Sequence, residues 1–427
     1  TSEAPTLTPT IIILLIGLGL LLIGIGLLGT LLGVRASVAS FSNIEIGMIM
    51  AGYYVGYVVG TMIAPRLIRS VGHIRVFAAF ASVAAATSLA FGLVVQPAVW
   101  LALRIISGLC VVALYMVVES WLNAQSTGPA RGRIFSTYMM STLVALGAPQ
   151  FNLLLGDDSE LTLYTLAANA ISLGVVPVAV TRDNEPRIEM AVPVGLRQLL
   201  VISPLGVAGS VIAGIVSGAF WGMAPVFGQR LDLGEIDIAM LMSTTILGGA
   251  LLQWPIGHLS DNWDRRTVLI LTSVATAAAA AVGGWIVISG GPGLVIASGV
   301  YGGLMFALYG ISVAHANDHL HQEQVLEATR GLLLVYGVGA FCGPLLAGAA
   351  MQLGGPVGLP AISAACALLL ALFGIYRVTR RAAPLPEEQT EYVAMARTTP
   401  LAQEMHPDAD PAPELDHTQP KDSGSRQ

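Results

Sequence analysis

The chain has 427 residues, of which 55% are hydrophobic and only 11% are charged, with a formal net charge of -6. A soluble chain carries about 25% charged residues, so this composition excludes an ordinary soluble protein and predicts an integral membrane protein. No basic cluster suited to nucleic acid is present. The single lysine, Lys421, excludes the P-loop motif of an ATP-driven transporter.

Twelve apolar runs are long enough to cross a bilayer as helices, which takes about 20 residues each. They are expected at roughly 10–34, 44–66, 74–95, 98–122, 133–155, 161–181, 206–229, 237–259, 267–289, 293–315, 328–352 and 357–378. The fold class predicted is an all-α integral membrane protein with twelve transmembrane helices in two six-helix halves.

Composition also predicts the division of the chain. The halves are expected at 1–181 and 206–380, joined by a linker at 182–205, the longest connection between spans. The tail at 381–427 is rich in proline and acidic residues and poor in large apolar residues. Such a segment cannot form a core of its own, so we expect a disordered tail.

The arginines predict the orientation. In a twelve-span chain one side receives Arg66, Arg69, Arg75, Arg131, Arg133, Arg182, Arg187, Arg197, Arg265, Arg266, Arg330, Arg377, Arg380 and Arg381. The other side has only Arg35 and Arg230. Since cytoplasmic loops carry the excess of arginine, both termini are expected in the cytoplasm, with the chain in the inner membrane of a bacterium.

The fourth span contains two ionisable residues, Arg104 and Glu119, in an otherwise apolar run. A charge inside a membrane helix is costly and marks a candidate functional site. Part of this span is repeated 194 residues later in the chain. The repeat pairs Gly108, Ala113, Leu114, Tyr115 and Asn123 with Gly302, Ala307, Leu308, Tyr309 and Asn317. This repeat predicts two related halves.

Two loops carry a further motif. After the eighth span the chain reads Gly257-His-Leu-Ser-Asp261-Asn-Trp-Asp264-Arg265-Arg266, and after the second span it reads Pro65-Arg-Leu-Ile-Arg69-Ser-Val-Gly72. The first resembles the G-x-L-x-D-R-x-G-R-R loop of the major facilitator superfamily, and the second is a weaker copy. Arg104-Ile-Ile-Ser-Gly108 resembles the superfamily's R-x-x-x-G motif. The segments 117–122, 131–140, 253–261 and 332–344 are similar to the YcaD-type branch.

This resemblance implies the major facilitator fold and secondary transport by alternating access, with a site between the halves. The candidate gating residues are Arg69, Gly72, Gly257, Asp261, Asp264, Arg265 and Arg266. The first, fourth, seventh and tenth spans would line the cavity, so the candidate substrate or coupling residues are Arg35, Arg104, Tyr115, Glu119, Trp221 and Tyr309.

Each candidate has a structural alternative. Arg104 would bind an anionic group or couple protons, or else be tied to carbonyl groups between helices. Glu119 would carry a proton, since it is the single acidic residue well inside a span, or else pair with Arg131, Arg133 or an arginine of the loop between the second and third spans. Arg35 would hold a substrate or simply anchor the first span at the membrane surface. The aromatic residues would bind an organic ligand or pack in the core.

The expected function is transport of a small organic solute coupled to protons. The alternative is a non-transporting membrane sensor or assembly factor built on the same fold. His315, His319 and His321 cluster after the tenth span, but His319 and His321 are two residues apart and could not share a helix face, so no metal site is expected. No cofactor and no enzymatic activity are expected, because no nucleophile–base set is present. The chain is expected to be a monomer in contact with membrane lipid.

Overall fold

The computed structural model describes residues 9–125, 130–156, 161–180, 195–320 and 322–380, and five residues of the tail: Tyr392, Thr398, Thr399, Leu401 and Ala402. Within these residues the chain is helical, without strands. The helices are α1 (Pro9–Val38), α2 (Asn43–Val71), α3 (His73–Leu93), α4 (Pro97–Gln125), α5 (Ala130–Gly147), η1 (Ala148–Leu155), α6 (Thr162–Leu173), α7 (Val175–Ala179), α8 (Leu196–Ile202), α9 (Pro204–Arg230), α10 (Glu235–Asn262), α11 (Arg265–Ser289), α12 (Leu294–Asn317), α13 (Gln322–Gly354), η2 (Gly355–Val357) and α14 (Gly358–Val378).

Eleven stretches of the described residues are long and apolar enough to cross a membrane. The last, Gln324–Val378, holds two helices, α13 and α14, which η2 joins and which pack against each other. With this stretch counted as two, the described chain has twelve helical segments that could cross a membrane, in agreement with the predicted number. Two crossings are built from consecutive shorter helices, α5 with η1 and α6 with α7.

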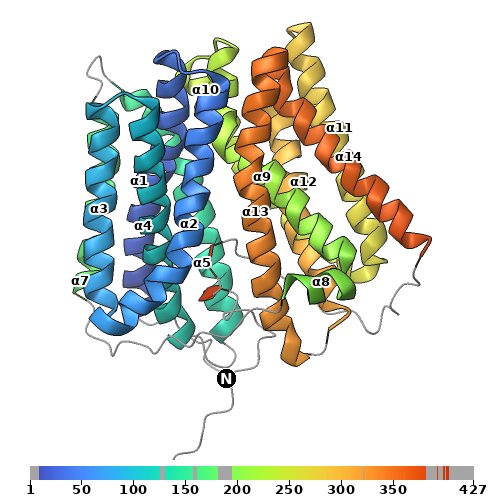
Figure 1. Ribbon diagram of the computed structural model, residues 1–427, viewed down its shortest axis with the longest axis horizontal. Helices are drawn as coiled ribbons and strands as arrows, with labels where there is room; N and C mark the ends of the chain where they lie inside the picture. The colour runs from blue at the N-terminus through green and yellow to red at the C-terminus, as the bar shows by residue number, and fades with distance from the viewer. Residues whose placement is uncertain are drawn as a thin grey trace, which may run out of the picture.

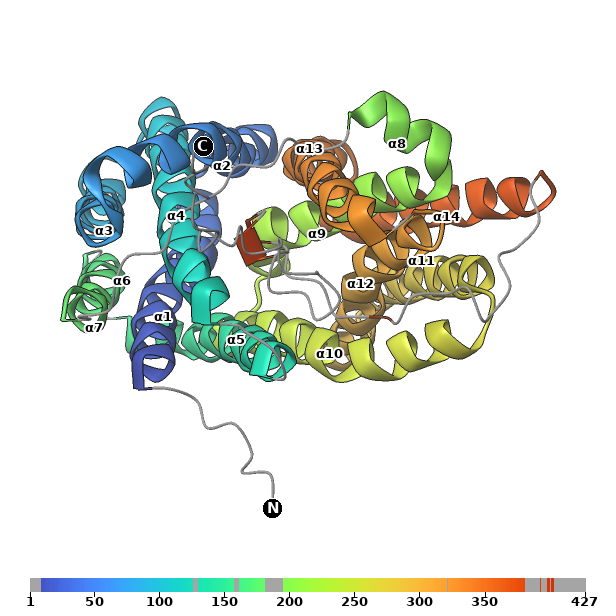
Figure 2. The same cartoon turned by 90° about the horizontal axis from the view of Figure 1, so that it is seen from below.

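The helices stand in two groups, α1–α7 and α9–α14, side by side (Figure 1). The groups touch where α1 meets α9, α2 meets α13, and α5 meets α10. We call the end of the bundle that holds α8 and the α2–α3 connection the linker face, and the other end the opposite face. Seen from the linker face, the short red ribbon of Leu401–Ala402 lies between the two groups (Figure 2).

Both groups use the same close helix contact. A Cβ atom added to Gly108 of α4 would lie 2.0 Å from the carbonyl oxygen of Tyr53 in α2. One added to Gly302 of α12 would lie 2.1 Å from the carbonyl oxygen of Thr245 in α10. Small residues allow membrane helices to approach this closely. The glycine repeat in the sequence therefore reflects a repeated helix contact.

Local interactions and backbone geometry determine where α2 and α3 begin. Ser42 and Glu45 form a capping box that starts α2. Gly72 lies between α2 and α3 with a φ of 98°, a backbone conformation that glycine adopts readily and other residues rarely do. The sharp turn that starts α3 therefore explains this glycine of the predicted gating set.

Large apolar side chains cover the outside of the bundle. Trp254, Ile296 and Leu353 are 76%, 76% and 90% exposed. A water-soluble protein rarely exposes so much apolar surface, whereas a bilayer is its natural surrounding. The exposed apolar residues are those that would contact lipid tails.

Candidate functional site

A cavity of about 280 Å³ lies between the two groups of helices. Its walls are largely aromatic, with a few polar groups. The polar and aromatic side chains that line it are Thr30, Tyr53, Tyr54, Tyr57, Thr61, Arg104, Tyr115, Tyr138, Thr142, Trp221, Gln253, Phe306, Tyr336 and Thr398. An apolar pocket with few convergent polar groups is the usual form of a site for an organic ligand.

The two groups make close contacts near the opposite face. The α carbon of Gly47 in α2 packs so tightly on Pro344 of α13 that an added Cβ would lie 2.6 Å from the Pro344 carbonyl oxygen. An Nη atom of Arg230, at the end of α9, donates to the carbonyl oxygen of Phe41 at 2.9 Å. These contacts lie beyond the cavity, so they close it toward the opposite face.

Arg104 faces this cavity from α4. Its guanidinium carbon lies 4.8 Å from the centroid of the Tyr53 ring, a cation–π contact. Among the described residues its Nε atom has no hydrogen-bond partner. The guanidinium group therefore rests on an aromatic ring, and its buried Nε atom is unpaired among the described residues.

Glu119 lies farther along α4 and is fully buried. Its carboxylate accepts hydrogen bonds from three hydroxyl groups, those of Tyr138, Thr398 and Thr399. Within the described chain no arginine forms an ion pair with it, so the predicted alternative, a salt bridge to a loop arginine, is not what this conformation contains. Tyr138 and Thr398 also line the cavity, which places Glu119 directly behind its wall.

The other predicted cavity residues divide into two sets. Tyr115 and Trp221 line the cavity, as expected. Tyr309 is 1% exposed, and its ring packs on Tyr336 with centroids 4.8 Å apart, so it supports the cavity wall from behind. Arg35 lies in the last turn of α1 and is not among the residues that line the cavity.

Several cavity residues were not predicted. Tyr53, Tyr54 and Tyr57 of the second span were not among the candidate residues, yet all three line the cavity. Tyr53 and Tyr57 are four residues apart and therefore share one helix face, which is a signal for a common surface. Tyr138 and Tyr336 fall within the segments 131–140 and 332–344, but nothing in the sequence shows that either side chain faces a cavity.

The predicted gating loop forms a charge network inside the second half. Arg265 is 1% exposed, and its guanidinium group reaches Asp318 at 2.5 Å and Asp261 at 3.0 Å. It also donates to the carbonyl oxygen of Ala314 at 3.2 Å. These contacts join the linker-face ends of α10, α11 and α12. The gating role expected for these residues remains a prediction.

Asp264 and Arg266 hold the start of α11. Asp264 accepts the backbone N–H of Arg266 and the hydroxyl of Thr267. Burial opposes its ionisation, but the hydrogen bonds from Thr267 and Arg266 and the charge of Arg266 outweigh burial and lower the pKa of Asp264. In the first half, Arg69 donates to the carbonyl oxygen of Pro65 at 3.3 Å, within α2.

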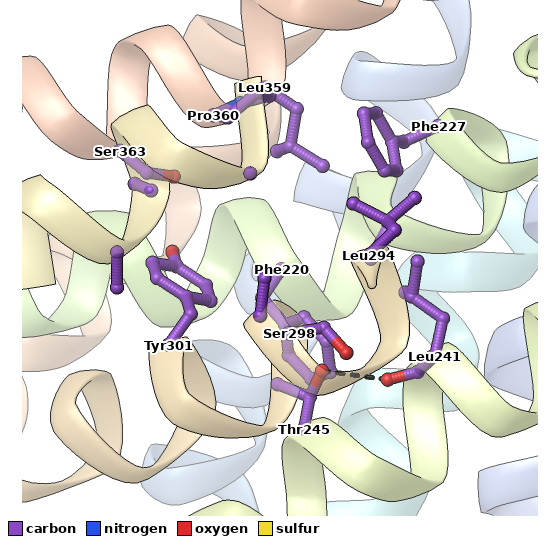
Figure 3. A pocket seen from close by; sticks show the side chains of 15 residues that line it. Phe220, Phe227, Leu241, Thr245, Leu294, Ser298, Tyr301, Leu359, Pro360 and Ser363 are labelled. Carbon is purple, nitrogen blue, oxygen red and sulfur yellow. Dashed lines mark hydrogen bonds between the residues drawn. The ribbon is translucent and has the colours of Figure 1, made fainter. Parts of the chain in front are cut away.

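A smaller cavity of about 70 Å³ lies inside the second half, between α9, α10, α11, α12 and α14 (Figure 3). Phe220, Phe227 and Leu359 surround it, with Tyr301 and Ser363 at one side. All its walls belong to one half, so a movement between the halves would not open it. We therefore place the candidate site in the larger cavity.

Known proteins are similar to this chain in sequence or in fold. Residues 206–412 match the family model of the Major Facilitator Superfamily. The uncharacterized MFS-type transporters YcaD of Salmonella arizonae and Salmonella typhimurium are each 30% identical over 358 residues, which cover 81% of this chain and 90% of theirs.

The solved structures with a similar fold include the nucleoside transporter NupG and a D-xylose–proton symporter. NupG has a TM-score of 0.69 and 14% identity, covering 88% of this chain and all of its own. The symporter has a TM-score of 0.66 and 14% identity, covering 89% of this chain and 99% of its own. Because the identity to YcaD extends over nearly the whole length of those relatives, the chain belongs to the major facilitator superfamily and is a transporter-family protein, not an enzyme.

Proposed function

We propose that this chain transports a small, neutral, hydroxyl-bearing organic solute across the bacterial inner membrane by alternating access, and that proton movement drives the transport. The observation that carries the proposal is the cavity between the two halves, with Glu119 and Arg104 of one helix at its wall. A site at the interface of two repeats suits a carrier whose halves rock around it.

The arginine pattern supports the orientation. The linker face holds the connections in which arginines gather, and cytoplasmic loops carry the positive excess. We therefore assign the linker face and both termini to the cytoplasm. Since the described contacts close the cavity toward the opposite face, this conformation corresponds to the inward-facing half of the cycle.

The polar groups support the choice of solute. Glu119 accepts hydroxyl donors from three side chains in this structure, so the same carboxylate can accept hydroxyl groups of a ligand. Aromatic rings around the cavity offer stacking surfaces for a sugar or a base. Two proteins of the same fold are described by their solutes as a nucleoside transporter and a D-xylose symporter, and both solutes carry several hydroxyl groups.

The burial of Glu119 supports proton coupling. A carboxyl group surrounded by apolar residues and hydroxyls, without a positive partner among the described residues, can alternate between a neutral and a charged form as its surroundings change. Protonation would release the hydroxyl groups that the carboxylate holds, which links the proton to the ligand.

The test uses proteoliposomes that contain a trapped pH-sensitive dye. Uridine, D-xylose, an amino acid, a dicarboxylate and a hydrophobic amine are added in turn outside. We expect uridine or D-xylose to acidify the interior with the wild-type chain and not with Glu119→Gln, while Glu119→Gln retains exchange of the same radiolabelled solute. Glu45→Gln, a change in a partly buried capping box that glutamine can also form, is the matched control.

Equal acidification by Glu119→Gln and the wild type would reject Glu119 as the proton carrier. If no solute in the panel is exchanged or acidifies the interior, the alternative of a non-transporting sensor gains support over transport.

A further inference from the structure

The five described residues of the C-terminal tail lie inside the bundle, although composition predicted a disordered tail. We call Tyr392, Thr398, Thr399, Leu401 and Ala402 the tail contact residues. They contact both halves of the protein: Tyr392 contacts the second half, and the other four contact the first. The rest of the predicted tail lies outside the described residues.

Tyr392 binds at the predicted gating loop. Its backbone N–H donates to a carboxylate oxygen of Asp261 at 2.7 Å. Its ring lies on Gly257 of α10 and its ring and hydroxyl lie on Gly310 of α12, where added Cβ atoms would approach to 2.2 Å and 2.6 Å. The two glycines therefore leave room for a flat aromatic ring, and a larger residue at either position would exclude it.

Thr398 and Thr399 bind at Glu119. Both hydroxyls donate to its carboxylate, and the Thr398 carbonyl oxygen accepts the Tyr57 hydroxyl at 2.7 Å. The Thr398 hydroxyl oxygen also lies 3.1 Å from the Tyr138 hydroxyl. Thr399 is fully buried, and Thr398 forms part of the cavity wall. Two hydroxyls of the tail thus occupy the position at which a hydroxyl-bearing solute would meet Glu119.

Leu401 and Ala402 secure this position. Leu401 is 5% exposed and Ala402 is fully buried, and both belong to the apolar core of the first half. The Ala402 N–H donates to the Thr399 carbonyl oxygen at 3.2 Å, which forms a tight turn directly after the two threonines. Apolar burial at the turn therefore holds the threonine hydroxyls against the carboxylate.

We propose that the tail contact residues form a tethered ligand of the cavity, which excludes solute while it is bound and which the solute displaces by competing for Glu119. The proposal rests on the proposed function in one respect, that the solute uses the same carboxylate. A tethered segment competes at a high effective concentration, so even weak intrinsic binding keeps the site occupied. Because the tail contact residues bind both halves, they must also leave before the halves can close at the linker face.

The test measures access to the cavity without any solute. Cys110, Cys342 and Cys366 are replaced by alanine, and Thr61, which lines the same cavity as Thr398, is replaced by cysteine. The rate of modification by a small charged methanethiosulfonate is then measured in four chains.

The four chains differ only in the tail. They are the full chain, a chain truncated after Arg381, the full chain with Thr398→Val and Thr399→Val, and a chain truncated after Ala402. The valine variants keep the side-chain volume and remove the hydroxyls, and the last truncation keeps all tail contact residues. We expect faster labelling in the second and third chains and an unchanged rate in the fourth. If the tail fills the cavity nine-tenths of the time, its removal increases the rate about tenfold.

A synthetic peptide of residues 390–404 supplies the matched control for folding. Added to the chain truncated after Arg381, it should restore slow labelling, and the same peptide with both threonines replaced by valine should not. Equal labelling rates in all four chains, or equal protection by both peptides, would overturn the proposal. Since no solute is used, a chain that transports nothing still gives this result, so the two proposals can fail separately.

Discussion

The buried arginine at the start of α11 allows a graded stability prediction. Arg265 is 1% exposed and contacts two carboxylates that differ in burial: the Asp318 side chain is 1% exposed and the Asp261 side chain is 32% exposed. Removing one partner of a buried pair costs about 3–5 kcal/mol, because a buried charge is left uncompensated. Exposed pairs contribute about 0.2–1 kcal/mol.

We therefore expect Asp318→Ala to destabilise the protein several times more than Asp261→Ala. The assay is thermal unfolding of the purified protein in one detergent, followed by tryptophan fluorescence. A paired variant, Arg265→Met with Asp318→Leu, removes both buried charges and should recover much of the stability. Equal losses for the two alanine variants, or a paired variant as unstable as Asp318→Ala, would refute the reasoning.

Two further predictions concern the helix contact and the helix cap. Gly108→Ala and Gly302→Ala should each lower the free energy of unfolding by about 1–3 kcal/mol, because the new methyl group meets a backbone oxygen that cannot rotate away. Gly19→Ala, which meets nothing within 4 Å, is the control and should be neutral or stabilising in the same thermal assay. Asp264→Ala should cost about 1 kcal/mol at neutral pH. Because the pKa of Asp264 is lowered from its usual 3.8, its contribution is complete above that value and is lost as the pH falls through the lower folded pKa. The difference in melting temperature from wild type should therefore shrink in acid, and a constant difference would contradict this.

Much of the fold could be predicted from the sequence because its main signals are local. A membrane span is a continuous apolar run, and a charge such as Arg104 or Glu119 is conspicuous within one. The glycine repeat was also informative, because Gly108 and Gly302 make equivalent close helix contacts in the two halves. The linker helix α8 was not predicted, because its seven residues are too few for a hydropathy signal.

The site itself depends on contacts that the sequence does not encode locally. Tyr138 is 19 residues from Glu119, and Thr399 is 280 residues from it. A tyrosine among serine and threonine residues and a threonine in a polar tail are both common, so neither stands out in the sequence. The described tail residues are buried against helices of the bundle, so the tail does not need enough apolar residues to form a core of its own. Composition alone therefore predicted a disordered tail.

The most direct test of alternating access is to measure two distances between the halves, one at each face, by double electron–electron resonance. Spin labels at Val38 and Glu235 report on the opposite face, and labels at Ser70 and Asn262 report on the linker face. These four side chains are exposed, so the labels should not disturb the core. Reconstituted protein is measured at neutral and acidic pH, with and without uridine or D-xylose.

Alternating access predicts two populations whose distances change in opposite directions, the opposite-face pair lengthening as the linker-face pair shortens. A change of pH or solute should shift the balance between them. A single distance at each face that no condition alters would contradict alternating access and favour a static sensor.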